Sequence, residues 1–177
     1  MREERFRQVR GVIWFVVITL AIHYSYRFWA MHLNYWPVQT WMAGLHQYMT
    51  DWVFNQSVWV NRHILGISMR ITDHTMWFDN GSGVMINASC SGDKQILQFA
   101  LLMLLYPGPW KHKLWYIPMG MLIVHATNIL RVVLMSVLGN LEPNYMKIVH
   151  DTALRAMFYI VIFALWAIWE EKVRVKR

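Results

Sequence analysis

Four apolar stretches dominate the pattern of hydrophobic and polar positions, and they predict helices that cross a membrane. The apolar core of a bilayer takes about 20 helical residues, and the first and third stretches are close to this length or longer. No small-residue cleavage site follows the first stretch, so it is interpreted as a span and not as a signal peptide. Together they predict an all-α polytopic membrane protein, a single integral membrane domain over residues 1–177. The four predicted transmembrane helices are residues 11–29, 92–106, 114–138 and 153–169.

Residues 31–89, between the first two predicted spans, change their pattern midway. Apolar positions in residues 38–53 follow helical spacing, which predicts an amphipathic helix that lies on the outer leaflet or caps the bundle. The position on the outer leaflet is the preferred interpretation. In residues 67–86 apolar and polar side chains alternate on both sides of Asp79-Asn80-Gly81, which predicts a small β-hairpin. This hairpin leads directly into Cys90.

Basic side chains are concentrated next to the apolar stretches, as the positive-inside rule expects of cytoplasmic flanks. Both termini are therefore predicted to be cytoplasmic, with residues 31–89 and 139–152 facing outward. The net charge of +7 could indicate a nucleic-acid partner, but no basic face interleaved with aromatic residues is visible, so none is predicted. The basic residues in question are Arg2, Arg5, Arg7, Arg10, Lys111, Lys113, Lys172, Arg174, Lys176 and Arg177.

The composition agrees with a membrane protein. Charged residues make up 15% of the chain, whereas an average soluble domain has about 25%. Eleven Trp and eight Tyr are typical of chains that contact the membrane–water interface. Cys90 is the single cysteine, which excludes an intramolecular disulfide.

Arg131 is a candidate functional residue because ionisable side chains inside a span are energetically expensive. It lies seven residues before the end of the third predicted span, about 10 Å below its outer end at helical rise. His125, Asn128 and Arg131 are spaced three apart and share one polar stripe, which is expected to face the interior of the bundle. The alternative is a structural charge that binds backbone carbonyls or extends toward the surface.

Cys90 and His150 add a nucleophile and a base at the same predicted depth. Cys90 lies at the start of the second span, where the unpaired N–H groups of a helix N-terminus would stabilise a thiolate, although Asp93 would oppose this effect if it pointed at the sulfur. His150 lies just outside the fourth span, where a solvated interfacial histidine is the alternative. A thiol, an imidazole and a guanidinium are sufficient for acyl transfer, through nucleophilic attack, proton transfer and oxyanion stabilisation.

These motifs resemble those of the exosortase/archaeosortase family of membrane cysteine transpeptidases. The resemblance rests on Ala88-Ser89-Cys90-Ser91-Gly92, on Asn128-Ile129-Leu130-Arg131 and on His150-Asp151, in this order. It extends from about residue 66 to residue 169. The resemblance implies that Cys90, Arg131 and His150 are catalytic. Ser91, Gly92 and Asn128 are then expected to shape the substrate site. The family often has an apolar residue and an arginine where this chain has Asp93 and Lys94, and many members have more spans.

The resemblance also implies partners and a location. The expected substrates are membrane-anchored proteins with a C-terminal sorting signal, cleaved on the outer side of a prokaryotic inner membrane. The acyl group would pass to an amine acceptor, carried by a lipid or a glycan. No cofactor is predicted.

Three other functions remain compatible with the sequence. A cysteine protease that releases its product to water would share every candidate residue. A non-enzymatic membrane scaffold or chaperone would have an inert Cys90 and a structural Arg131. A haem or metal site is disfavoured despite eight histidines, because there is no His-x-x-x-His pattern and no acidic ligand cluster.

Overall fold

The computed structural model describes residues 2–174, without the side chains of residues 2–8, 147, 151, 155 and 174. Part of the third basic stretch, Lys176 and Arg177, lies outside the described residues. The helices are α1 (Arg2–His32), α2 (Gln39–His63), α3 (Asp93–Leu105), α4 (Trp110–Leu141), α5 (Met146–Asp151) and α6 (Ala153–Trp169). The strands are β1 (Met69–Thr72), β2 (Thr75–Phe78) and β3 (Gly83–Met85).

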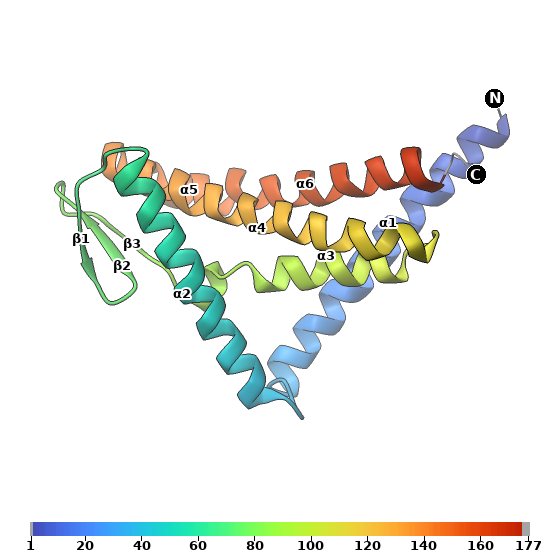
Figure 1. The fold of residues 1–177 in the computed structure, drawn as a ribbon, viewed down its shortest axis with the longest axis horizontal. Coiled ribbons are helices and arrows are strands. Elements are labelled where there is room, and N and C mark those ends of the chain that lie inside the picture. Colours follow the sequence, from blue (N-terminus) through green and yellow to red (C-terminus); the bar gives the residue numbers. More distant parts are fainter. Residues whose placement is uncertain (1, 175–177) are drawn as a thin grey trace.

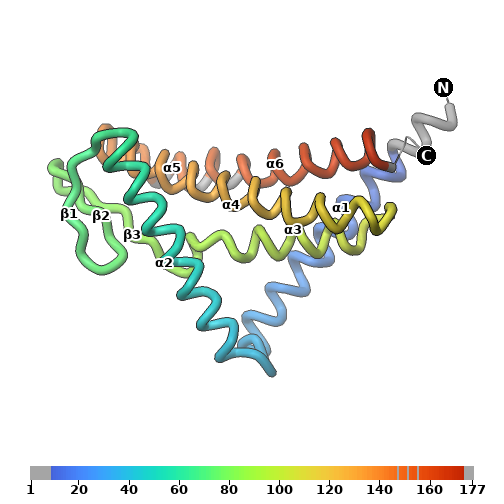
Figure 2. Tube along the Cα trace, in the orientation of Figure 1, coloured from blue at the N-terminus to red at the C-terminus, as the bar shows by residue number. Residues whose placement is uncertain are grey.

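Helices α3, α4 and α6 lie side by side along the long axis of the molecule, whereas α1 and α2 form a V (Figure 1). The arms of the V meet at residues 33–38, away from the bundle, and return to it at different ends (Figure 2). Both ends of the chain and the turn between α3 and α4 lie at one end, the basal end. The sheet and α5 lie at the opposite, distal end (Figure 1). The described parts of the three basic stretches are therefore gathered at the basal end.

Two of the four predicted spans are long and apolar enough to cross a membrane. They are Val9–His32, with a mean hydropathy of 1.4, and Trp110–Leu141, with a mean hydropathy of 1.9. Helix α3 has 13 residues and extends about 20 Å, which is shorter than the bilayer core, and α6 has 17 residues. The prediction of four spans is thus supported for α1 and α4, while spans at α3 and α6 stay a prediction.

Helix α2 packs against α4 and against the 3-10 turn Ala88–Cys90, named here the Cys90 turn. Met42, Met49 and Val53 are buried, as the predicted apolar face requires. Trp41 and Tyr48, predicted on the same face, are 66% and 63% exposed. The helix therefore covers the bundle with a narrower face than predicted, and the Trp41 and Tyr48 side chains point away from the protein.

The predicted hairpin is a three-stranded antiparallel meander, because Thr75–Phe78 inserts as a middle strand. In β2, Met76 and Phe78 are buried and Trp77 is exposed, which is the alternation expected of a half-buried strand. The Met76 and Phe78 side chains pack with α2 and with Val132 of α4. The sheet is thereby fixed onto the distal half of α4, and its last strand delivers the chain to the Cys90 turn.

A hydrophobic core separate from the one under the sheet lies among α1, α3, α4 and α6, toward the basal end. Gly120 lets α3 and α4 approach closely, since a Cβ there would lie 2.2 Å from the Phe99 ring. Lys113, one of the predicted cytoplasmic flanks, is buried and donates hydrogen bonds to the Leu104 and Tyr106 carbonyls, at 2.8 and 2.7 Å. It thus satisfies carbonyls that the end of α3 leaves unpaired.

Candidate active site

Arg131 and His150 are brought together although 19 residues separate them. Helix α4 places Arg131 on its buried face, and the short helix α5 returns His150 to the same level. Arg131 Nη2 lies 2.7 Å from His150 Nε2. A guanidinium can only donate hydrogen bonds, so Nε2 must be the acceptor. The contact fits the tautomer of His150 that carries its proton on Nδ1.

Cys90 ends the Cys90 turn, and α3 begins three residues later at Asp93. The expectation that Cys90 starts the helix is thus corrected, because Ser91 and Gly92 lie between Cys90 and the first residue of α3. The turn is closed locally, since Asn87 Oδ1 accepts from the Ser89 N–H and the Asn87 carbonyl accepts from the Cys90 N–H, at 3.0 and 2.8 Å. The Cys90 side chain is partly exposed.

Asn128 and Gly92 fix the Cys90 turn against α4. Asn128 Nδ2 donates a 2.8 Å hydrogen bond to the Cys90 carbonyl, and its side chain is fully buried. Gly92 has a φ of 76°, in the left-handed region, and a Cβ on it would lie 2.7 Å from Asn128 Nδ2. The backbone beside the thiol can therefore approach α4 only with glycine at this position.

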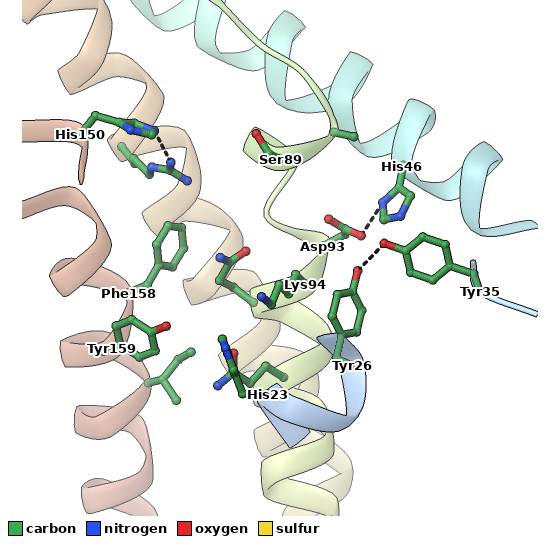
Figure 3. A pocket seen from close by; sticks show the side chains of 15 residues that line it. His23, Tyr26, Tyr35, His46, Ser89, Asp93, Lys94, His150, Phe158 and Tyr159 are labelled. Carbon is green, nitrogen blue, oxygen red and sulfur yellow. Dashed lines mark hydrogen bonds and ion pairs between the residues drawn. The ribbon is translucent and has the colours of Figure 1, made fainter. Parts of the chain in front are cut away.

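A buried ion pair that the sequence did not suggest holds the turn from the other side. His46 Nδ1 of α2 lies 2.7 Å from Asp93 Oδ2, and Asp93 is only 8% exposed (Figure 3). The Ser91 hydroxyl lies within hydrogen-bonding distance of Asp93 Oδ1 and of the Ala88 carbonyl, at 2.5 and 2.7 Å. Asp93 thus contacts α2 through His46 and is tied to the turn through Ser91. The sequence signal was a histidine on the polar face of the predicted amphipathic helix.

Two pockets meet at the Arg131–His150 pair. Cys90 lines the smaller one, of about 370 Å³, between the sheet and α4. The larger one, of about 710 Å³, extends among α1, α3 and α6 (Figure 3). Ser89, Arg131 and His150 line both pockets. All three predicted catalytic side chains therefore line the smaller pocket, and two of them also line the larger one.

His125, on the same stripe as Asn128 and Arg131, contacts α2 and not the two pockets. Its Nε2 lies 3.0 Å from Gln56 Oε1, and its ring stacks on Trp52 with centroids 4.6 Å apart. The stripe faces the interior as predicted, but His125 attaches α2 to α4 and lines neither pocket. Among the described residues there is no group of three or more His, Cys, Asp or Glu that could hold a metal ion.

Comparison with known families decides the relationship. The family model of the transmembrane exosortases matches residues 8–174, nearly the whole chain. The chain belongs to the transmembrane exosortase family. No curated protein and no solved structure shows a significant similarity to this exosortase. The match confirms the family indicated by the three motifs and, with two apolar helices of spanning length, identifies a membrane protein.

The site of this exosortase contains the parts needed for acyl transfer. A partly exposed thiol, an imidazole and a guanidinium line one pocket, and they come from three separate segments of the chain. The Arg131 guanidinium lies against the Phe158 ring, 5.6 Å from its centroid, so an aromatic face supports it from α6. The roles of these side chains follow from chemistry and are developed below.

Proposed function

We propose that this exosortase is a membrane-embedded cysteine transpeptidase. It cleaves the C-terminal sorting signal of membrane-anchored proteins and transfers the new acyl end to an amine. The observation that carries the proposal is the shared pocket of Cys90, Arg131 and His150, with Arg131 in direct contact with the His150 imidazole. Family membership supports the same reaction class.

The contact between Arg131 and His150 defines a resting state. While Nε2 accepts from Arg131, its lone pair is not free to take a proton from a thiol. The carbonyl oxygen of a bound substrate offers the guanidinium a better acceptor, because negative charge develops on that oxygen during attack. Movement of Arg131 toward it frees Nε2, which then takes the proton of Cys90.

The transfer then follows in two balanced halves. The Cys90 thiolate attacks the substrate carbonyl, the peptide C–N bond breaks, and the leaving amine takes the proton from His150. An acceptor amine next attacks the thioester and gives its proton to His150. The C–S bond breaks, and this proton returns to the Cys90 thiolate. No cofactor takes part in either half.

We further propose that the basal end faces the cytoplasm of a prokaryotic inner membrane, so that the site opens outward. Lys111 is exposed and is the second residue of α4, which begins at the same end as both ends of the chain (Figure 1). The concentration of basic residues there supports this orientation under the positive-inside rule.

The test uses the purified full chain in detergent micelles and the activated ester p-nitrophenyl acetate. Acylation should release p-nitrophenolate and leave an acetyl thioester on Cys90, sensitive to hydroxylamine and detected by mass spectrometry. His150→Ala should slow acylation by about a hundredfold, a typical contribution of a general base. The exposed His112 provides the matched control, since His112→Ala should acylate at the wild-type rate.

A second arm follows processing in cells. Cys90→Ser is nearly isosteric and should accumulate uncut membrane-anchored protein, because a hydroxyl is far less ionised than a thiol. Unchanged processing by Cys90→Ala would refute the enzyme and leave the scaffold function, for which Cys90 is inert.

A further inference from the structure

Strand β3 is an edge strand, because in the described part of the chain only β2 pairs with it. The Ile86 N–H donates to the His74 carbonyl at 2.9 Å, so the backbone of residue 86 faces β2. Hydrogen-bonded and non-hydrogen-bonded positions alternate along an antiparallel ladder. The backbone of Val84 therefore also faces β2, whereas the N–H and carbonyl groups of Gly83 and Met85 point to the open edge.

The smaller pocket follows this open edge. Residues 83–87 line it one after another. Successive side chains of a strand point to opposite faces, so a pocket on one face is lined by every second residue, and an unbroken run places this pocket along the edge. Its other wall is apolar and consists of Val132 and Met135 of α4 and Met146 of α5. The three candidate catalytic side chains line the same pocket, so the edge leads to the candidate nucleophile.

The edge is held in place and is not protected against pairing. Asn80 Nδ2 donates to the Gly139 carbonyl at 2.7 Å, which fixes the turn between β2 and β3 onto α4. Proteins usually guard an edge strand with a charge, a proline or a covering segment. Strand β3 contains neither a charge nor a proline, and Met85 is 61% exposed. An extended peptide can add to such an edge through main-chain hydrogen bonds.

The direction of the substrate decides which part of it reaches the edge. In the proposed function the membrane anchor of the substrate follows the cleaved bond, so it lies toward the membrane. The exosortase chain runs from β3 at the distal end through Cys90 to α3, which ends at the basal end (Figure 1). The residues that precede the cleaved bond therefore lie on the side of the sheet and run, like β3, toward Cys90.

We propose that the open edge of β3 binds the residues that precede the cleaved bond as an added strand, parallel to β3. The inference rests on the proposed function and describes how the substrate is held. The N–H and carbonyl groups of Met85 bond to the substrate main chain. Every second substrate side chain faces the wall of Val132, Met135 and Met146, so the site selects apolar residues at alternate positions. The side chains between them face away from α4.

The experiment compares two esters that present the same reacting residue to Cys90. Acetyl-Ala-Val-Ala-Gly p-nitrophenyl ester contains a segment that can add to β3, and acetyl-Gly p-nitrophenyl ester does not. With either ester, the Cys90 sulfur bonds to the glycyl carbonyl carbon, the C–O bond breaks, p-nitrophenolate leaves, and the thiol proton passes to His150. The acylation rate at limiting ester concentration is measured on the full chain in detergent micelles, and Cys90→Ala provides the background. The ratio of the two rates does not depend on how much of the protein is active, so partial misfolding cannot imitate the result.

The wild type should react about tenfold or more faster with the longer ester, the factor expected of two main-chain hydrogen bonds. A series of longer esters, each with one backbone nitrogen methylated, should show an alternating effect. Every second methyl group should remove most of the gain and those between should leave it, because only alternate N–H groups of an added strand face β3.

Met85→Pro should lower the ratio of the two rates, since proline lacks the N–H and its ring occupies the edge. Proline is tolerated on an edge strand where the N–H makes no ladder bond. Met69→Pro is the matched control on the opposite open edge. Met69 begins β1 opposite Phe78, whose N–H donates to the Ser82 carbonyl on the β3 side, so the Met69 N–H also points away from the ladder. This variant should keep the wild-type ratio.

The outcomes separate the two proposals. A longer ester that reacts no faster than the shorter one overturns the added strand and leaves the transpeptidase intact. A methylated series without alternation also overturns it, as does a wild-type ratio in Met85→Pro. If Met85→Pro does not fold, the methylated series on the wild type decides alone. Failure of both esters to form a thioester on Cys90 refutes the proposed function, and the added strand fails with it.

Discussion

Gly92→Ala tests whether the Cys90 turn is held by close contact with Asn128. Two costs are expected. The left-handed φ of 76° costs an alanine about 1–2 kcal/mol. The new Cβ would also lie 2.7 Å from Asn128 Nδ2 and 2.8 Å from its Cγ, so the amide must move and lose its bond to the Cys90 carbonyl, which costs about 1 kcal/mol. The total destabilisation is about 2–3 kcal/mol.

A double-mutant cycle with Asn128→Ala separates these costs. Asn128→Ala alone loses the same hydrogen bond, and in its background Gly92→Ala has no amide to displace, so the backbone cost and a 3.1 Å contact with the Cβ of residue 128 remain. The two substitutions should therefore be less costly together than the sum of the single effects, by about 1 kcal/mol. The free energy of unfolding is measured by SDS titration of the protein in micelles, and the reactivity of Cys90 toward a thiol probe is followed in parallel. Single effects that add within about 0.4 kcal/mol would show that the contact does not hold the turn.

Three further predictions concern the site and the topology. Arg131→Lys keeps the charge but loses the planar fork, so acylation of the enzyme by p-nitrophenyl acetate should fall by about tenfold or more, and wild-type rates would reduce its role to simple charge. Asp93→Asn weakens the buried ion pair with α2 and should lower the free energy of unfolding by about 1–3 kcal/mol, whereas a neutral effect in SDS titration would make the pair dispensable. In a Cys90→Ala background, Arg62→Cys should react with a membrane-impermeant thiol reagent in intact cells and Lys111→Cys should not; the reverse labelling would invert the proposed orientation.

Much of the candidate site could be predicted from the sequence, because chemistry and topology restrict it strongly. Arg131 was singled out by the cost of a charge inside an apolar stretch, and the stripe it shares with Asn128 does face the interior. The structure then places Arg131 of α4 in contact with His150 of α5, the two residues that were predicted to lie at the same depth. The family itself was also readable from three short motifs in order, and it is confirmed over residues 8–174.

The spacing of apolar residues predicted burial and short strands less reliably, because tertiary packing decides which apolar side chains of a helix are buried and which short segments pair as strands. The apolar face of α2 contained both aromatic and aliphatic residues, and burial selected Met42 and Val53 but left Trp41 exposed. The strand Thr75–Phe78 was missed because four residues give only two alternations, which is too short a pattern to distinguish from a loop. Its pairing on both sides with β1 and β3 is what makes it a strand.

The sequence by itself determined the membrane class, the family and the interior stripe on α4, and it named the candidate residues for the chemistry. These follow from hydropathy, charge and residue type, which are properties of single positions or of short spacings. Only the tertiary structure decided the rest: that His46 contacts Asp93, that Gly92 makes room for Asn128, and that two pockets meet at Arg131 and His150. Each of these joins segments far apart in the chain, and the distances between such segments depend on how the helices cross and pack, which no local pattern encodes.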